Sequence, residues 1–537
     1  MLKTCSIKLN KDGSIVRARA PECAGISSAA VLKMLAHLEQ SGFQYHSLMI
    51  VRNGVVAAEC YRYPVTRTCA HTMYSVSKTF TGTAVGFAVS EGLISLDTRV
   101  ADILPEYRKK KEKNGYIDKM TVRHLLTMTS GKLPSPLLNK TQDDWLSHLF
   151  DAKWVSEPGT KFDYVNENMY TLCAILHRVT GMSVVDFLMP RLFEPLGIER
   201  PVWETDGHGV EAGGWGLFLK TEDIAKVMLC YHNGGRWGDK QVIDEEWVKQ
   251  ATSNQHGDNP GVRERGYGYG IWIKDENEYY AGGMFCQMSY IFEKEDCAAV
   301  ITSCSPTDTP YYEALEILRN EGFIQPDANA TADEEFIKSI SERKIDFIPK
   351  SAIRSKLEKS ISGRTVHFKK DKILNAVGFP TGVLHLAAVY MSKYRAGNID
   401  DVRFDFYGED MRFSWREGNE RNSVKCGMNG EYINSRIVLA NTPYTAASAA
   451  FWQDERTLNV WIRPIESLCC RKLKFTFESG GTVKMEPASS PDVSDIVASV
   501  DGAIHSMFGE KLSFLADKTL AEIKKLTQPV QKGKFRD

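Results

Sequence analysis

The pattern of hydrophobic and polar positions predicts a helix, a hairpin and a buried helix within the first hundred residues. Apolar residues recur with a helical period over residues 28–41. Two β-rich runs between residues 46 and 63 flank Asn53-Gly54, the dipeptide most typical of a two-residue hairpin turn. Residues 75–93 (SVSKTFTGTAVGFAVSEGL) are apolar on most sides and rich in small residues. They therefore predict a central helix that packs closely against its neighbours.

The order of the later segments indicates the fold class. Helical patterns follow one another between residues 121 and 234, and several end at a glycine. Strand-like runs return at residues 266–273, 288–293 and 297–303, and residues 308–321 read as a last helix. Because strands from both ends enclose a helical stretch, we expect an α+β domain whose sheet is closed by both chain ends.

A polar, Ala/Asp-rich stretch marks a change in character along the chain. We predict a first domain over residues 1–325, a linker over 326–336 and an accessory domain over 337–537. Beyond the linker, short runs such as VRFDFY and KLKFTFE stand between turn-like stretches, which indicates an antiparallel sandwich or barrel. Residues 513–527 (SFLADKTLAEIKKLT) predict a helix near the C-terminus.

Composition narrows the functional classes. The 537 residues are 43% hydrophobic and 25% charged with a net charge of −1, so no overall field attracts nucleic acid or an anionic membrane. We expect no transmembrane helix, because no run of about 18 apolar residues occurs. The N-terminus has frequent charges and lacks the apolar region of a secretory signal. The 12 cysteines follow neither zinc nor disulfide spacing, so we expect reduced thiols and a cytoplasmic location.

The first candidate for catalysis is Ser75-Val76-Ser77-Lys78, which directly precedes the buried helix. A serine hydroxyl is a poor nucleophile without a nearby base. Positions three residues apart share a helix face, so Lys78 can reach the Ser75 hydroxyl. Burial lowers the pKa of an amine, and a neutral Lys78 would accept the serine proton. Ser341 and Lys344 repeat this spacing in a charged segment, which we interpret as solvated surface.

The second candidate is Tyr164-Val165-Asn166, which lies in a Pro/Gly-rich loop before a helical pattern. A tyrosine phenolate near a lysine ammonium can share proton transfer with serine. An asparagine amide can bind the carbonyl or side chain of an acyl group. The alternative is a half-buried tyrosine followed by a turn asparagine.

With these motifs, the chain resembles the serine β-lactamase/penicillin-binding-protein superfamily, and within it the class C-like esterases, D-aminopeptidases and related hydrolases. The resemblance implies that Ser75 is the acylated nucleophile, Lys78 its proton acceptor, Tyr164 the partner base or acid and Asn166 a substrate contact. It implies an antiparallel sheet flanked by helices, with an all-helical region. The β-rich end of the chain resembles the barrel-like or lipocalin-like domains appended to other hydrolases of this family. Seven stretches match in family order: MYSVSKTFTGTAVG, GLISLDTRVADILPEY, TVRHLLTMTSG, EPGTKFDYVNENMYTL, LFEPLGI, GGWGLFLKTEDIAKV and GYGYGIW.

The third family motif departs from its usual form. Family members carry Lys-Thr-Gly or His-x-Gly on a strand beside the nucleophile, and here Ala281-Gly282-Gly283 takes its place. Gly283 is retained, and the resemblance implies that the Met284 N–H pairs with the N–H of the nucleophile as an oxyanion hole. Gln287 lies near this strand, either as a pocket contact or as a polar strand residue.

The missing cation changes the expected substrate. In the family it helps to hold a substrate carboxylate, a contact worth roughly 1.5–3 kcal/mol. We therefore expect a preference for uncharged esters or amides. Arg263 or Arg265 could supply a replacement cation.

The expected function is a serine hydrolase that cleaves a small ester, amide or short peptide through an acyl-enzyme. D-aminopeptidase-type and weak β-lactamase activities are alternatives within this class. A catalytically silent homologue that binds a ligand or partner is the alternative from another class. No metal, cofactor, nucleic acid or membrane partner is expected, and a homo-oligomer is left open.

Overall fold

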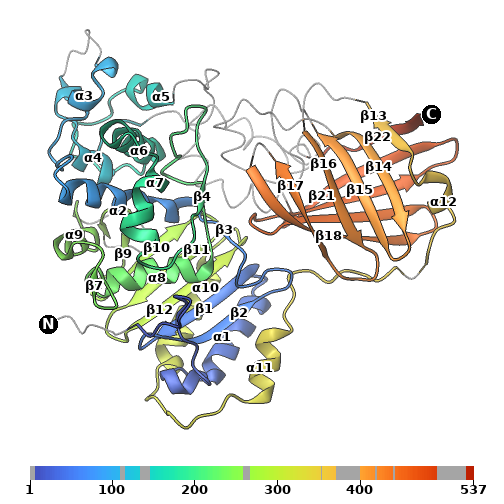
Figure 1. The fold of residues 1–537 in the computed structure, drawn as a ribbon, viewed down its shortest axis with the longest axis horizontal. Helices are drawn as coiled ribbons and strands as arrows, with labels where there is room; N and C mark the ends of the chain where they lie inside the picture. The colour runs from blue at the N-terminus through green and yellow to red at the C-terminus, as the bar shows by residue number, and fades with distance from the viewer. Residues whose placement is uncertain are drawn as a thin grey trace. The chain divides into compact units, whose positions relative to one another are not determined.

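The computed structural model describes residues 7–108, 115–133, 145–257, 266–351, 353–369, 399–417, 420–439, 442–492 and 528–536. The chain divides into two compact units, Met1–Arg343 and Lys344–Asp537. Their ribbon is shown in Figure 1.

An antiparallel sheet forms the centre of the first unit, as the order of the sequence segments predicts. Strands from the beginning and the end of the unit meet in its middle, where β1 pairs with β12. At the predicted hairpin turn, Asn53 and Gly54 have φ values of 53° and 74°, as a two-residue turn of this kind requires. In spatial order the strands are β2 (Val55–Tyr61), β1 (Tyr45–Arg52), β12 (Cys297–Ser303), β11 (Gln287–Phe292), β10 (Glu278–Gly283), β9 (Trp272–Ile273) and β8 (Gly266–Tyr267).

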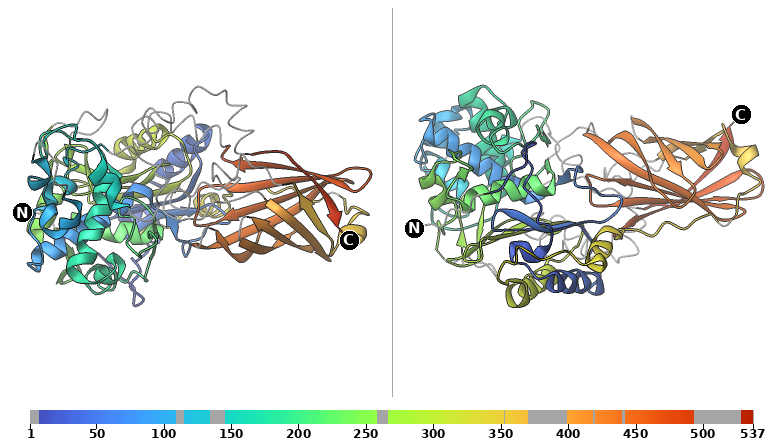
Figure 2. Two further views of the ribbon diagram at one scale, coloured as in Figure 1. Left: turned by 90° about the horizontal axis from the view of Figure 1, so that it is seen from above. Right: turned by 60° about the horizontal axis from the view of Figure 1, so that its bottom comes forward.

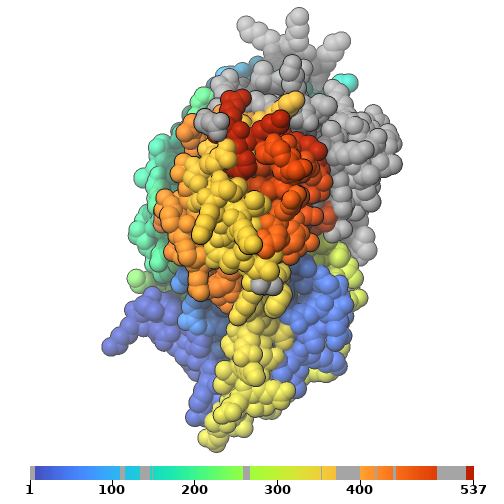
Figure 3. Space-filling model, turned by 90° about the vertical axis from the view of Figure 1, so that its right-hand side faces the viewer, coloured from blue at the N-terminus to red at the C-terminus, as the bar shows by residue number. Residues whose placement is uncertain are grey.

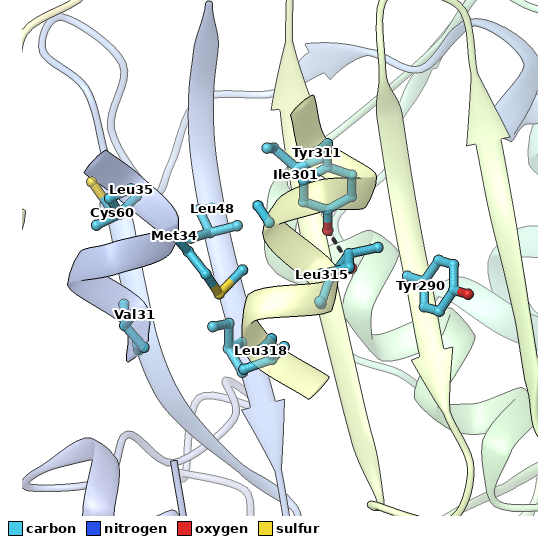
Figure 4. Close-up of a cluster of buried hydrophobic side chains, with 14 of the residues drawn as sticks. Val31, Met34, Leu35, Leu48, Cys60, Tyr290, Ile301, Tyr311, Leu315 and Leu318 are labelled. Atoms are coloured by element: carbon cyan, nitrogen blue, oxygen red, sulfur yellow. Dashed lines mark hydrogen bonds between the residues drawn. The ribbon is translucent and has the colours of Figure 1, made fainter. Parts of the chain in front are cut away.

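Helices α1 (Ser28–Gln40) and α10 (Thr309–Ile317) lie side by side on one face of this sheet (Figures 1 and 2). Their apolar side chains pack with those of the strands into one core, in which Met34, Leu48 and Leu315 are at most 1% exposed (Figure 4). The Tyr311 hydroxyl donates to the Ala299 carbonyl at 3.1 Å, which satisfies its polar group inside this core.

The opposite face carries α8 (Thr221–His232), and the buried helix α2 (Ser77–Ser90) lies between the sheet and the helical region. The helical region itself is grouped around α6 (Asn166–Thr180), which ends at Gly181 with φ of 68°. Its other helices are α3 (Val100–Ile103), α4 (Val122–Leu126), α5 (Leu146–Asp151) and α7 (Val184–Leu188).

The shorter elements complete the first unit. The strands are β3 (His71–Thr72), β4 (Val202–Trp203), β5 (Leu217–Leu219), β6 (Arg236–Trp237) and β7 (Lys240–Gln241), and the helices are α9 (Glu245–Ala251) and α11 (Glu334–Ser341). The 3-10 helices are η1 (Pro21–Ala24), η2 (Tyr74–Val76), η3 (Pro105–Tyr107) and η4 (Tyr116–Asp118), and the π-helical segments are η5 (Met189–Phe193) and η6 (Leu318–Gly322).

The first unit extends beyond the predicted boundary at residue 325. Helix α11 begins within the stretch predicted as a linker, and its Phe336 is 4% exposed in the core of the first unit. The Tyr63 N–H donates to the Arg343 carbonyl at 2.9 Å, so chain after α11 is still bound to the first unit. Residues 326–336 are therefore a polar segment within the first unit and not a linker between the two units.

The second unit is the β-rich domain that the sequence predicts, and it is a barrel rather than a sandwich. A pairing between β16 and β18 closes a ring of nine strands within the described residues, and β17 pairs with β18 outside this ring. In spatial order the strands are β16 (Glu420–Gly427), β15 (Asp410–Glu417), β14 (Ile399–Tyr407), β13 (Thr365–Phe368), β22 (Gln531–Arg536), β21 (Thr482–Ser490), β20 (Cys470–Phe477), β19 (Thr457–Pro464), β18 (Thr442–Asp454) and β17 (Ile433–Leu439).

The chain before β13, with α12 (Glu358–Ile361), runs over the outside of the barrel and is yellow in Figure 3. Ser351 accepts the Trp452 N–H at 2.9 Å, and Ser355 donates to the Glu455 carbonyl at 2.6 Å. These contacts fix the segment to β18 and to the turn that follows it. The C-terminal helix predicted at 513–527 lies outside the described residues.

Within the described residues, no single helix is long and apolar enough to cross a membrane. Helix α6 and the segment formed by α7 and η5 reach that length only as a pair bent by 72°.

Candidate active site

Ser75 lies in the one-turn helix η2, between strand β3 and helix α2. The preceding residue, Tyr74, has a φ of 45°, a backbone region that residues with side chains rarely adopt. Such conformations persist only where surrounding contacts enforce them, and they cluster at functional sites. The Ser75 side chain is half-buried, whereas Lys78 one turn later is 1% exposed. A reactant from solvent can therefore reach the hydroxyl but not the amine.

The Lys78 amine has three polar partners. Its Nζ lies 2.9 Å from Ser75 Oγ, 2.7 Å from Asn166 Oδ1 and 2.7 Å from the Gly214 carbonyl oxygen. Burial lowers the pKa of Lys78 well below its usual value, although Glu167 acts in the opposite direction. The spacing of Ser75 and Lys78 in the sequence predicts this contact, and the lysine is buried as expected.

Small residues bring α2 into this position. A side chain at Gly82 would place its Cβ 2.5 Å from the Tyr269 carbonyl oxygen, so only glycine fits there. One turn earlier, the Thr79 hydroxyl donates to the Gly270 carbonyl at 2.7 Å. The small face predicted for residues 75–93 therefore anchors the helix that carries Lys78 against the segment between β8 and β9.

Tyr164 contacts the same lysine through its ring, whose centroid lies 4.7 Å from Lys78 Nζ. Burial raises the pKa of the Tyr164 hydroxyl, and a hydrogen bond with the Ser75 side chain partly opposes this effect. Trp272 stacks on the Tyr164 ring with centroids 5.3 Å apart, and Tyr267 meets it edge to face at 6.0 Å. Phe162 packs against both Tyr267 and Trp272, which completes an aromatic cluster around Tyr164.

Strand β10 ends at Gly283, against the turn that carries Ser75. A Cβ on Gly283 would lie 2.4 Å from the Met73 carbonyl oxygen and 3.1 Å from the Ser75 backbone nitrogen. The backbone that leads into Met284 therefore runs directly beside the backbone of Ser75, and only a glycine at position 283 allows this approach. Two residues earlier, Ala281 is 1% exposed and offers only a methyl group.

A family model described as beta-lactamase matches residues 34–321, slightly more than half of the chain. The chain belongs to the beta-lactamase family. Ser75, Lys78, Tyr164, Asn166 and Gly283 all lie within the matched range.

Curated relatives cover only part of this chain. The beta-lactamase of Escherichia coli (strain K12) is 32% identical over 141 residues, which are 26% of this chain and 36% of the relative. The 6-aminohexanoate-dimer hydrolase of Paenarthrobacter ureafaciens is 25% identical over 227 residues, 38% of this chain and 57% of the relative. The chain thus spans well under two thirds of each. Among solved structures, the octameric penicillin-binding protein homologue from Pyrococcus abyssi is 16% identical with a TM-score of 0.43, over 85% of this chain and 97% of that one.

Gln287 does not have the free amide that a substrate contact requires in this beta-lactamase-family site. Its side chain is 0% exposed, and its Nε2 donates to the carbonyls of Met284, Phe285 and Ser303 at 3.2, 3.1 and 2.7 Å. Its Oε1 accepts the Ser303 N–H at 3.2 Å. The side chain therefore holds the turn after β10, and the alternative of a polar strand residue fits its position.

Two groups that act on Lys78, one by a hydrogen bond and one electrostatically, have no counterpart among the sequence-predicted residues. The Gly214 carbonyl is a backbone acceptor, which no motif of side chains can indicate. Glu167 is 9% exposed in the first turn of α6, and burial raises its pKa to about 7 although Lys78 lowers it. The sequence did contain one signal for Glu167, namely an acidic residue directly after the Tyr164-Val165-Asn166 motif. Arg263 and Arg265, the suggested replacement cations, lie outside the described residues.

Proposed function

We propose that this chain is a serine hydrolase that cleaves small uncharged esters or amides through an acyl-enzyme on Ser75. The observation that carries the proposal is the 2.9 Å contact between Ser75 Oγ and Lys78 Nζ, together with the burial of the lysine. Burial favours the neutral amine, which is the form that can accept a proton.

The contacts of Lys78 fix the direction in which a neutral amine would act. Such an amine has two N–H bonds and one lone pair. The oxygens of Asn166 and Gly214 can only accept, so they orient the two N–H bonds. The lone pair is then directed at Ser75, the partner that has a proton to give.

In the acylation step, the Ser75 oxygen attacks the substrate carbonyl carbon and its proton passes to Lys78. The carbonyl π electrons move to the oxygen, giving a tetrahedral oxyanion. We propose that the N–H groups of Ser75 and Met284 stabilise this oxyanion, since the backbone at Gly283 runs beside that of Ser75. Losing one such donor typically costs about 3 kcal/mol.

Tyr164 is the proposed proton carrier on the leaving side. Its hydroxyl interacts with the Ser75 side chain, which lowers the pKa of Tyr164, and its ring lies against Lys78. A proton can then return from Lys78 to the departing oxygen or nitrogen through Tyr164. As the carbon–oxygen or carbon–nitrogen bond breaks, the leaving group keeps the bonding electrons and takes that proton. Water then attacks the acyl-enzyme by the reverse route and releases the acid.

The expected substrate is uncharged near Ala281. A buried methyl group cannot hold a substrate carboxylate, so β-lactams and C-terminal D-alanine peptides lack that contact there. The half-buried Phe162 and Trp272 offer apolar surface instead. Both the beta-lactamase and the 6-aminohexanoate-dimer hydrolase relatives are named for cleavage of amide bonds, so amides belong in the test set with esters.

A fluorophosphonate probe tests the proposal, because it phosphonylates activated serines. We expect the wild-type chain to be labelled and Ser75→Ala to lose both label and ester turnover. Ser77→Ala is the matched control two residues away. It removes an oxygen that accepts the Leu217 N–H at 3.2 Å, so it should keep the label. An unlabelled wild type without turnover would instead favour a silent, ligand-binding homologue.

A further inference from the structure

Glu167 is a buried carboxyl group that the proposed proton transfers do not use. It is the second residue of α6, directly after Asn166, whose Oδ1 lies 2.7 Å from Lys78 Nζ. Its side chain is 9% exposed and forms no ion pair within 4 Å in the described part of the chain. A buried carboxyl without such a partner is costly, which calls for an explanation.

Two groups oppose the effect of burial on the pKa of Glu167, first its own backbone N–H at the start of α6 and then Lys78, which is the charged group that acts on it among the described residues. Helix α6 packs against α2, α3, α4, α5 and α7. Apart from Lys78 on α2, the charged side chains that the structure describes on those elements have other partners or are exposed to solvent. On α4, Arg123 pairs with Asp97, and His124 accepts the Thr121 N–H. On α7, Asp186 pairs with Arg200. Asp102 of α3 and Asp151 of α5 are exposed to solvent.

We propose that Glu167 is the counter-charge of Lys78 and sets the pH above which Lys78 becomes a free base. The inference rests on the proposed function, since it requires that Lys78 deprotonates Ser75. Glu167 touches neither Ser75 nor the reacting carbonyl, so it acts as a positioning residue for the charge on Lys78.

Two opposing effects act on the lysine. Burial favours the neutral amine, and the nearby carboxylate favours the ammonium. The three acceptors at 2.7–2.9 Å and the Tyr164 ring suit an ammonium, which has three N–H bonds to donate. Without a counter-charge, burial and these neutral partners alone would determine where the lysine titrates. With Glu167 ionised, Lys78 retains its proton to a higher pH.

The experiment compares the pH dependence of kcat/KM for a p-nitrophenyl ester in the full-length wild type and in Glu167→Gln. This substitution keeps the shape of the side chain and removes its charge. We expect the acidic limb of the profile to move to lower pH by about one unit. Below the wild-type limb, activity relative to each protein's own plateau should then rise about tenfold in the variant.

Two further variants separate electrostatics from packing. Glu167→Asp keeps the charge and should leave the limb closer to the wild-type position than Glu167→Gln does. Glu211→Gln makes the same chemical change at another buried carboxylate, which is 1% exposed and accepts the Val185 N–H at 3.1 Å. We expect no displacement of the limb in Glu211→Gln.

The outcomes distinguish the two levels of the proposal. In Glu167→Gln, the plateau of kcat/KM could fall while the acidic limb of the pH profile stays at its wild-type position. That result would give Glu167 a packing role only and overturn the inference. Equal displacement in Glu211→Gln would also overturn it. Wild type without turnover or fluorophosphonate labelling would remove the proposed function itself, independently of Glu167.

Discussion

Tyr74 and Phe285 both adopt left-handed backbone conformations, with φ of 45° and 60°, and their rings meet edge to face with centroids 5.3 Å apart. Tyr74 precedes Ser75, the proposed nucleophile, and Phe285 lies in the turn after β10. The contact therefore joins the two backbone segments that we propose to form the oxyanion hole. The ring contact helps to hold both residues in these unfavourable backbone conformations.

Gly283→Ala should separate these segments. The new Cβ would lie 2.4 Å from the Met73 carbonyl oxygen, which is backbone and cannot rotate away. We expect kcat for a neutral ester to fall by about 100-fold, as for the loss of an oxyanion donor. Gly282→Ala is the control, since its Cβ meets the Tyr280 ring at 2.8 Å and a side chain can adjust. Equal losses in both variants would contradict the role given to Gly283.

Gln287→Met tests whether this residue supports the turn. The substitution removes the donor of three carbonyls and the acceptor of the Ser303 N–H. We expect the free energy of unfolding to fall by about 1–3 kcal/mol in chemical denaturation, because buried polar groups lose their partners. An unchanged stability combined with a raised KM would instead restore the prediction of a substrate contact.

Lys78→Met should flatten the dependence of stability on pH. Since burial lowers the native pKa of Lys78, the unfolded chain binds more protons between that pKa and about 10.4, and stability rises with pH in this window. Methionine has no proton to bind, so this contribution disappears together with ester turnover. Denaturant titrations at several pH values measure the slope. The exposed Lys338→Met variant should keep it, and an equal slope in Lys78→Met would show that the native lysine stays charged.

A substrate panel tests the consequence of Ala281. We expect kcat/KM for p-nitrophenyl esters to exceed that for a chromogenic cephalosporin by about tenfold or more, which corresponds to one missing charge-assisted contact. A D-alanine anilide and 6-aminohexanoate dimer extend the panel to amides. Faster cephalosporin cleavage would mean that another group supplies the missing cation.

The main elements of the first unit could be predicted because their signals are local. The Asn53-Gly54 turn, the small face of α2 and the Ser75–Lys78 spacing depend on neighbouring residues, and the structure forms each as expected. For the second unit, the residue pattern alone left a sandwich or a barrel open, and the family resemblance favoured the barrel that the structure shows. Closure depends on the pairing of β16 with β18, a contact that no local pattern specifies.

The rest of the candidate site depends on contacts between distant segments. Gln287 looks like a pocket residue in sequence, yet the course of the turn places three carbonyls around its amide. Trp272 reaches Tyr164 because β9 pairs beside β10. The domain boundary could not be predicted for the same reason, since the single buried ring of Phe336 packs an otherwise polar segment against the core.

The Gly214 carbonyl has a consequence for how the proposed chemistry of Lys78 can be altered. Exchanging a side chain cannot delete a main-chain oxygen, so an alanine scan would leave this ligand of the lysine untested. The oxygen moves only if the surrounding loop moves, and neighbouring Gly213 and Gly216 have φ of 64° and 86°. Substitutions at these two glycines, which bear no functional group, would therefore retune the acid–base chemistry from a distance. Engineering or natural drift in that loop could shift the working pH while every recognisable motif stayed intact.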